Sequence, residues 1–366
     1  MKNYNPKNKH SLDTYTKTLE NSELLYIHIP FCDSKCYYCA FNSYTNLNHL
    51  KNKYFDAIKE QFLKEASKYK TVFIGGGTPS TMSVEFYEKL FDLINPYIKN
   101  AKEITIEANP NTKYEWLKSI RELGVDRISF GVQSFNEDKL KFLNRNHSKN
   151  QAIEAINNAK KAGFENINLD LIYSTALDTK ELLQNDLNIA FSLPITHISA
   201  YSLTIEENTA FEGDFSKRKH DEELEIWFID KIKEKFPQYE ISNFGKPCLH
   251  NLGYWYGCEY TGIGAGAVGF KNNKEKYRYY TQNNVYEYIK NPTKYTLEKL
   301  NEEDIKKEKV FLGLRSILGF DENILNEEEK KRTGILINEG KLYKKDSKIF
   351  AYDFLLADAI TAYILD

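Results

Sequence analysis

Short apolar runs alternate with longer amphipathic segments through the first two-thirds of the chain. The runs at 24–30, 71–74, 103–107, 127–131, 167–172 and 197–202 are typical of buried strands. The segments at 50–67, 84–98, 113–123 and 150–162 repeat apolar residues at helical spacing, and a glycine directly follows each of the last two. Repeated strand-then-helix units predict a parallel sheet with helices outside it.

The number and extent of these units define the expected domains. Six strands are fewer than the eight of a closed TIM barrel, so we expect an α/β fold with a partial (β/α)6 TIM-like barrel over residues 23–245. Beyond 245 the alternation stops, and helices are expected at 303–317, 327–333 and 353–365 with a hairpin at 340–351. These elements predict a small winged-helix-like α+β domain within a C-terminal region, 246–366. Residues 1–22 are expected to form a polar N-terminal tail.

The charge and hydropathy of the chain indicate which kinds of binding partner to expect. The 50 basic and 52 acidic residues give a formal net charge of -2, which does not favour nucleic acid as a partner. No apolar run approaches the roughly 20 residues of a membrane helix, so we expect no integral membrane segment, while peripheral contact stays open. A polar N-terminus without a signal sequence and only five cysteines fit a reducing cytoplasm.

Three cysteines in eight residues are the strongest chemical signal. Cys32, Cys36 and Cys39 have C-x3-C-x2-C spacing directly after an expected strand. Three thiolates can hold three irons of a four-iron cluster and leave the fourth open, whereas electron-transfer clusters normally use four cysteines. A structural zinc site, which usually needs four ligands, and chance spacing are the weaker alternatives.

The cysteine triplet and its lead-in at 26–32, YIHIPFC, resemble the radical S-adenosylmethionine (SAM) superfamily, and more specifically its coproporphyrinogen-oxidase-like branch. That branch contains an oxygen-independent coproporphyrinogen dehydrogenase and haem chaperones. The resemblance implies a [4Fe-4S] cluster on Cys32, Cys36 and Cys39, with SAM chelating the open iron. It also implies a partial six-unit barrel and, where SAM is cleaved, transfer of one electron to its sulfonium.

The same resemblance implies a set of SAM contacts. Glycines after a strand let the backbone approach a ligand closely, and carboxylates at strand ends suit a cationic one. A salt-bridged structural acid or a packing aromatic is the alternative role for such residues. The implied contacts are Tyr26, Tyr38, Gly76, Gly77, Thr78, Glu107, Gln133, Arg145, Asp170 and Val268.

A second motif concerns haem. The segment 250–255, HNLGYW, resembles the H-N-x-x-Y-W motif of haem chaperones. This implies haem binding by His250, Asn251, Tyr254 and Trp255, with His250 favoured as an iron ligand because imidazole is a common axial ligand. The alternative is a histidine that caps the junction between two domains. Cys248 and Cys258 flank the motif, and buried free cysteine is their commoner role.

Two absences separate the branches. No fourth cysteine follows Cys39, and only 25 residues precede Tyr26, whereas the dehydrogenase has both a fourth cysteine and a longer extension. We therefore expect a haem chaperone that passes haem to an acceptor such as a respiratory haem protein. The alternatives are a coproporphyrinogen III dehydrogenase, which we do not favour, and a degenerate cluster protein that binds neither SAM nor haem.

The chain also departs from the family pattern. Residues 174–179 are STALDT where the family has GLPGQT, Ala40 replaces an acidic residue, and Val268 replaces the histidine of a G-I-G-A-G-A-H-G segment. These changes affect the SAM pocket more than the haem motif. They leave open whether SAM is cleaved or only bound.

Overall fold

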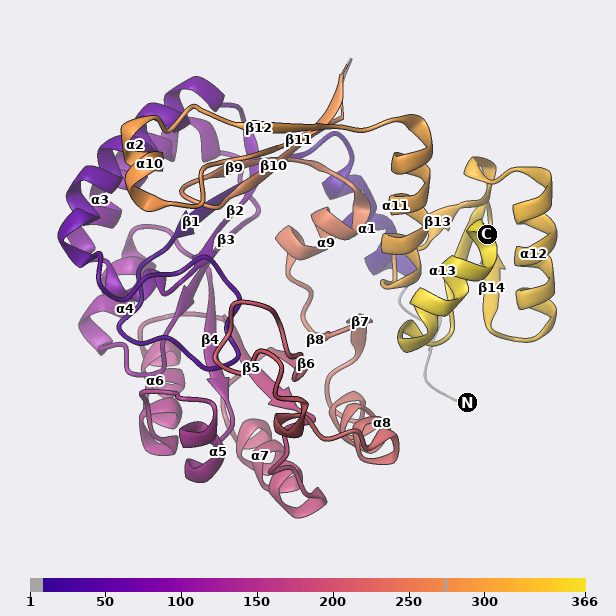
Figure 1. Cartoon of the computed structure of the whole chain (residues 1–366), viewed down its shortest axis with the longest axis horizontal. Helices are drawn as coiled ribbons and strands as arrows, with labels where there is room; N and C mark the ends of the chain where they lie inside the picture. The colour runs from indigo at the N-terminus through magenta and orange to yellow at the C-terminus, as the bar shows by residue number, and fades with distance from the viewer. Residues whose placement is uncertain (1–8, 273–274) are drawn as a thin grey trace.

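The computed structural model describes residues 9–272 and 275–366. Its centre is a parallel sheet in which six strands lie side by side in chain order, and the paired strands run in the same direction (Figure 1). The strands are β1 (Glu23–Ile29), β2 (Tyr69–Gly76), β3 (Glu103–Ala108), β4 (Arg127–Gln133), β5 (Asn166–Tyr173) and β6 (His197–Ser202). The sheet does not close, because β1 and β6 each have a further neighbour. The expected partial (β/α)6 barrel is therefore confirmed.

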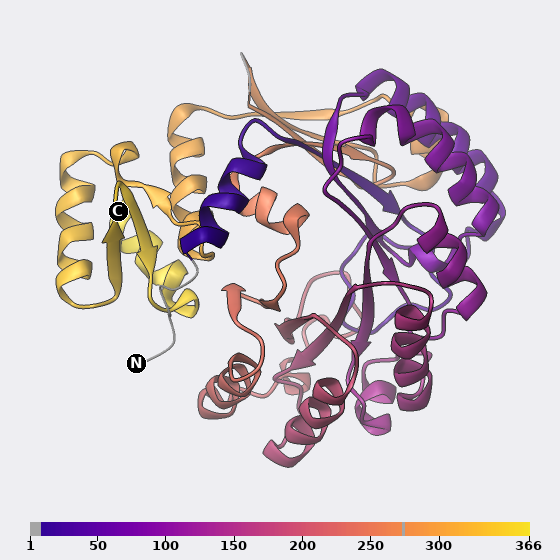
Figure 2. The same cartoon turned by 180° about the vertical axis from the view of Figure 1, so that it is seen from behind.

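Helices cover the outside of this sheet (Figures 1 and 2). Most begin at a side-chain cap; Ser148, for example, forms a reciprocal capping box with Gln151 at the start of α6. Their apolar faces join the strands in one large buried core. They are α2 (Lys51–Glu65), α3 (Val84–Ile98), α4 (Tyr114–Glu122), α5 (Glu137–Phe142), α6 (Lys149–Lys161), α7 (Lys180–Ser192) and α8 (Glu222–Lys233).

The sheet continues past residue 245, where we expected the core to end. Strand β9 (Glu259–Ile263) pairs parallel to β1, and β10 (Val268–Asn272), β11 (Lys276–Tyr280) and β12 (Thr296–Lys299) extend this edge antiparallel. On the other edge, β8 (Asn243–Gly245) pairs with β6, and β7 (Gln238–Glu240) pairs with β8. Helix α10 (Val285–Lys290) packs on α2. Residues 259–299 therefore belong to the sheet of the core.

Two helices lie at the open side of the barrel (Figures 1 and 2). Helix α9 (Leu249–Tyr256) packs against β2, α1 and α11. Helix α1 (Lys9–Leu19) forms within the expected polar tail and ends in Leu19, which is buried beside Leu252. The expectation for residues 1–8 lies outside the described residues.

The last 65 residues form a small α+β unit, as expected for a winged-helix-like domain. A three-stranded sheet packs with three helices around its own apolar cluster, which runs from Val310 to Ile364. The expected hairpin is present as β14 and β15. The elements are α11 (Glu302–Leu314), β13 (Phe320–Asp321), α12 (Glu327–Asn338), β14 (Leu342–Lys345), β15 (Lys348–Ala351) and α13 (Ala357–Leu365). In the described part of the chain, no helix is long and apolar enough to span a membrane.

Candidate functional site

The cysteine loop lies at the carboxyl end of β1, and all three of its thiols are free. Thr78 donates a hydrogen bond from Oγ1 to Cys32 Sγ at 3.2 Å, and Arg145 donates from a terminal guanidinium nitrogen to Cys36 Sγ at 3.1 Å. Burial raises the pKa of Cys32, whereas the Thr78 hydrogen bond favours its thiolate. These donors are suited to thiolate ligands of a metal cluster.

In residues 9–272 and 275–366, no three His, Cys, Asp or Glu side chains converge as ligands of a single metal ion.

The glycine stretch after β2 packs directly against the cysteine loop. Gly76 has a φ of +110°, and a Cβ there would lie 2.5 Å from His28 Cε1, so only glycine fits. The Gly77 amide donates to Ile29 O and the Thr78 amide to Phe31 O, each at 2.8 Å. This pairing fixes the backbone of 76–78 next to the cysteines, where we expected SAM contacts.

Two half-buried acids, Glu107 and Asp170, lie on β3 and β5. Glu107 accepts a hydrogen bond from the Gly76 amide at 3.1 Å, and Asp170 accepts one from Asn168 Nδ2 at 2.7 Å. Burial, followed by the charge of Asp170, raises the pKa of Glu107 to about 8. Burial also raises the pKa of Asp170. Two neighbouring carboxyl groups with raised pKa values would be stabilised in their charged form by a cationic ligand.

Gln133 and Arg145 meet near the cysteine loop. Gln133 ends β4 in a left-handed conformation, with a φ of +69°, at an irregularity in the β4–β5 register. A Cβ on Gly131 would lie 3.1 Å from Gln133 Nε2 and 3.3 Å from a terminal nitrogen of Arg145, so both side chains crowd the same glycine. Arg145 also donates to Asn109 Oδ1 at 2.9 Å, while its buried Nε has no partner.

Tyr26 and His28 form the wall beside the glycines. His28 Nε2 donates to the Asn42 carbonyl at 2.8 Å, so His28 Nδ1 accepts from the Tyr26 hydroxyl at 3.0 Å. Burial lowers the pKa of His28 to about 4, which keeps it neutral. Tyr38 packs against an apolar cluster that includes Ile172.

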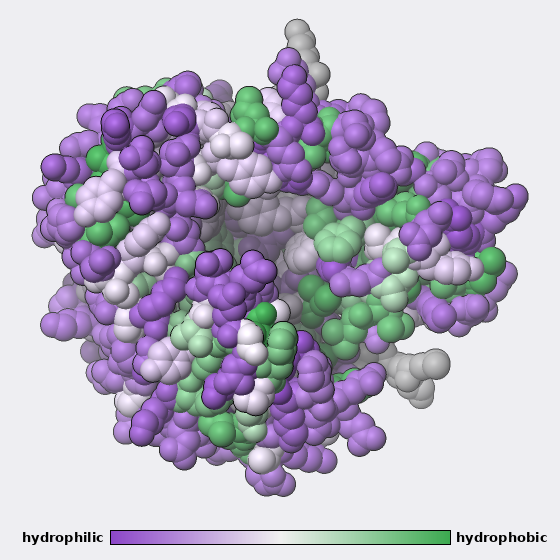
Figure 3. Space-filling model, viewed as in Figure 1, coloured by the Kyte–Doolittle hydropathy of each residue, from purple (hydrophilic) through white to green (hydrophobic). Residues whose placement is uncertain are grey.

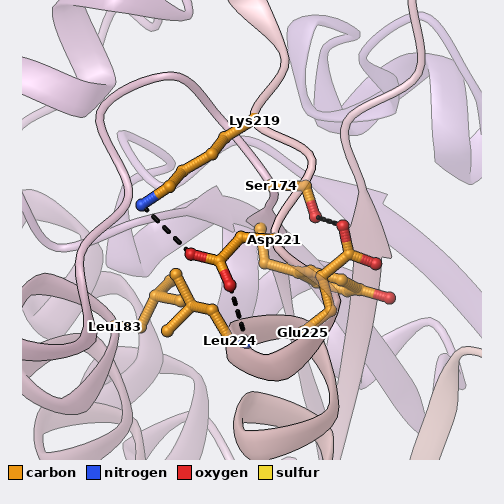
Figure 4. Close-up of a pocket in the computed structure, with 7 residues that line it drawn as sticks. Ser174, Leu183, Lys219, Asp221, Leu224 and Glu225 are labelled. Atoms are coloured by element: carbon orange, nitrogen blue, oxygen red, sulfur yellow. Dashed lines mark hydrogen bonds and ion pairs between the residues drawn. The ribbon is translucent and has the colours of Figure 1, made fainter.

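The loop that departs from the family pattern is held by polar contacts (Figure 4). Ser174 adopts a φ of +64° and donates from its hydroxyl to Glu225 at 2.7 Å. Nearby, Lys139 and Asp178 form an ion pair at 2.6 Å in which neither side chain has any exposed surface. Asp178 also accepts from the Thr175 amide at 2.8 Å. The loop therefore has a defined shape without the family's proline and glycines.

Helix α9 carries the motif that resembles a haem site. His250 is fully buried, with Nδ1 2.7 Å from Thr71 Oγ1 and Nε2 2.9 Å from the Tyr254 hydroxyl. Burial lowers the pKa of His250 to about 3. Glu103 caps the helix by accepting from the amides of Leu249 and His250. Asn251 and Trp255 are half-buried.

A cavity of about 1000 Å³ is lined by residues of this helix and by two of the expected SAM contacts, Tyr26 and Val268. Figure 3 shows the hollow between the barrel and the C-terminal unit, with apolar side chains along it. The SAM-side wall contains Tyr26, Asn42 and Val268, and aromatic side chains of α9 form part of the opposite wall. Basic residues from three elements also line the cavity, a set that sequence reasoning missed: Arg278, Lys309 and Lys348.

Comparisons with known proteins agree with this geometry. Residues 26–184 match the family model described as the radical SAM superfamily. The fold is similar to that of coproporphyrinogen III oxidase (HemN) from Escherichia coli, described as a radical SAM enzyme, with a TM-score of 0.78 and 20% identity over 96% of this chain and 93% of that one. Barrel and cysteine loop together define a radical SAM protein.

Curated relatives specify the family further. The chain is 38% identical to the haem chaperone HemW of Bacillus subtilis over 80% of this chain and 83% of the relative. It is 35% identical to the haem chaperone HemW of Lactococcus lactis over 92% of this chain and 94% of the relative. The chain belongs to the HemW family.

Proposed function

We propose that this protein is a haem chaperone built on a radical SAM core: it binds haem and transfers it to an acceptor protein, such as a respiratory haem protein, in the cytoplasm. The observation that carries the proposal is the large cavity, which is lined both by two of the expected SAM contacts, Tyr26 and Val268, and by aromatic residues of α9. Pockets for small ligands measure roughly 300–1,000 Å³, so this cavity is large enough for a haem-sized ligand. The names of the HemW relatives support the same cargo.

The residues at the carboxyl ends of the strands fit a cluster and SAM. Cys32, Cys36 and Cys39 would hold three irons, and the donors on Cys32 and Cys36 would stabilise their thiolates. Glu107 and Asp170 would face the positive groups of SAM, and the backbone of Gly76 and Gly77 lies beside them. The other SAM contacts expected from the sequence, including Tyr38, Gln133, Arg145 and Val268, belong to the same proposal. When bound, the cluster supplies the electron for any reductive cleavage of SAM.

Anaerobic haem titration tests the proposal. The reconstituted protein is titrated with haem while the Soret absorption is recorded, and apo-acceptor is then added. We expect saturation at one haem per chain and transfer of the bound haem. A signal that rises without saturation, or haem that never leaves for an acceptor, contradicts chaperone function.

The HemN-like fold supports one alternative, oxidative decarboxylation of coproporphyrinogen III. Product analysis with coproporphyrinogen III, SAM and a reductant separates the two functions. Decarboxylated porphyrinogen formed at many turnovers would establish the dehydrogenase. Absence of product beside saturable haem binding supports the chaperone.

A further inference from the structure

His250 has no nitrogen available to the cavity. Its side chain has no exposed surface, and each ring nitrogen lies within hydrogen-bond distance of a hydroxyl, Thr71 Oγ1 on one side and Tyr254 on the other. Phe73 packs against the imidazole with the ring centroids 5.3 Å apart. Ligation of iron by His250 Nε2 would break its hydrogen bond to Tyr254, and any movement of the ring toward the cavity would also break the buried one to Thr71.

Tyr254 occupies the position between His250 and the cavity. It lies one turn further along α9, lines the cavity, and contacts the imidazole edge-on at a centroid distance of 4.8 Å. In the tautomer with a proton on Nδ1, the histidine donates to Thr71 and Nε2 accepts from the Tyr254 hydroxyl. The phenol that lines the cavity is thus already hydrogen-bonded to a ring nitrogen of His250. Burial keeps both groups neutral, because it raises the pKa of Tyr254 and lowers that of His250.

We propose that Tyr254, rather than His250, supplies the oxygen that bonds the iron of ferric haem, and that His250 acts through it. On binding, the Tyr254 O–H bond breaks, and the phenolate oxygen bonds the iron in place of a hydroxide ligand, which leaves with the proton as water. His250 stays neutral and changes tautomer, so that Nε2–H donates to the phenolate and Nδ1 accepts from Thr71. No electron is transferred in this step. Tyrosine is a known axial haem ligand, as in catalase. This inference rests on the proposed haem-binding function.

The rest of the cavity is consistent with a macrocycle beside Tyr254. Tyr260 packs edge-on against Tyr254 at 4.8 Å, and Phe270 continues this aromatic wall. The basic side chains of Lys309 and Lys348 also line the cavity, as does Arg278, which pairs with Glu308 of the same lining; Asp321 is a second acid there. Aromatic walls suit the porphyrin faces and cations suit its propionates.

The test compares single-oxygen deletions in the full-length protein. Ferric haem is titrated into the wild type, Tyr254→Phe, and the control Tyr256→Phe, whose hydroxyl belongs to another tyrosine of α9 that lines the same cavity. Resonance Raman excitation in the visible region detects an iron–phenolate vibration directly in the wild type. We expect this signal in the wild type and the control, its loss in Tyr254→Phe, and about tenfold weaker binding there.

His250→Gln provides a second measurement, because glutamine can still hydrogen-bond to the phenol. The phenolate signal is expected to persist in this variant with altered frequency and weaker binding. If the haem-bound wild type shows no iron–phenolate signal, the inference is wrong even though haem binds. It is also wrong if that signal is unchanged in Tyr254→Phe but lost in His250→Gln. Failure of the wild type to bind haem saturably overturns the proposed function instead.

Discussion

At the scale of single residues, the proposed contact between Glu107 and SAM predicts that SAM binding depends on pH. Its carboxyl group, with a pKa of about 8, is mostly protonated at neutral pH in the SAM-free protein. The positive groups of SAM favour the carboxylate, so binding below pH 8 must release the proton. We expect SAM affinity to rise by about tenfold from pH 6 to pH 7 and to level off above pH 8.

Calorimetric titration of SAM across this pH range checks the slope. Glu107→Gln removes the titrating group and should bind SAM weakly with little pH dependence, whereas Glu122→Gln, at an exposed site, should keep the wild-type profile. An identical slope in wild type and Glu107→Gln would show that another group releases the proton.

A second prediction at the residue scale concerns the contribution of Lys139 to the free energy of unfolding. It pairs with Asp178 where neither side chain is exposed, and its charge also favours the ionised form of buried Asp186. Lys139→Met leaves these carboxylates unpaired, and removing one partner of a buried pair costs about 3–5 kcal/mol of unfolding free energy. Urea unfolding measures the loss, with exposed Lys141→Met on the same helix as control.

A double variant separates charge from packing. Adding Asp178→Asn to Lys139→Met removes one unpaired charge, so part of the lost stability should return. If the double variant is less stable than Lys139→Met, the packing of the lysine stem matters more than the ion pair.

At the scale of elements, helix α9 depends on one carboxylate from a strand. Glu103 on β3 accepts hydrogen bonds from the backbone amides of Leu249 and His250 at the start of this helix. It also accepts one from Cys248 Sγ. Glu103→Ala leaves these amides without their acceptor, and loss of such a cap costs about 0.5–2 kcal/mol. We expect faster amide hydrogen exchange along α9 and weaker haem binding. Unchanged exchange in α9 would show that packing alone holds this helix.

The sequence predicted the regular elements of the barrel well because their signals are local. Strand β1, helix α3 and the cysteine loop follow from hydrophobic runs, helical spacing and cysteine spacing within a few residues. Helix α9 was missed because its glycine and aromatic residues are poor helix signals and its support comes from Glu103 and β2, far away in the chain. Strands β9–β12 were missed for a similar reason: β9 is defined by its pairing with β1.

In the candidate site, too, the features with local sequence signals were predicted and those that depend on distant contacts were not. Gly76, Glu107 and Gln133, which we expected to contact SAM, lie at the carboxyl ends of parallel strands, so their position follows from the order of the strands. The setting of His250 depends on Thr71, 179 positions away, and no sequence signal connects them. The three basic residues of the cavity come from β11, α11 and β15, which is why no basic cluster was visible in the sequence.

At the scale of the whole molecule, the cavity unites the extended core sheet with the C-terminal unit. Arg278 belongs to the core sheet, Lys309 to α11 and Lys348 to β15. Haem carries two propionates, so cations from separate elements can bind it only while these parts keep their arrangement. Haem affinity should therefore depend on residues of both the core sheet and the C-terminal unit, whereas SAM affinity should depend on residues of the barrel alone.

The double variant Lys309→Gln and Lys348→Gln tests this division. Exposed ion pairs contribute roughly 0.2–1 kcal/mol each, so removing two cations should weaken haem binding by about two- to thirtyfold. The binding of haem dimethyl ester, which lacks the propionate charges, should not change, and neither should SAM binding. Lys331→Gln, an exposed lysine of α12 that does not line the cavity, is the control. Equal loss of haem and of its dimethyl ester would show that the two lysines support the fold of the cavity instead of binding propionates.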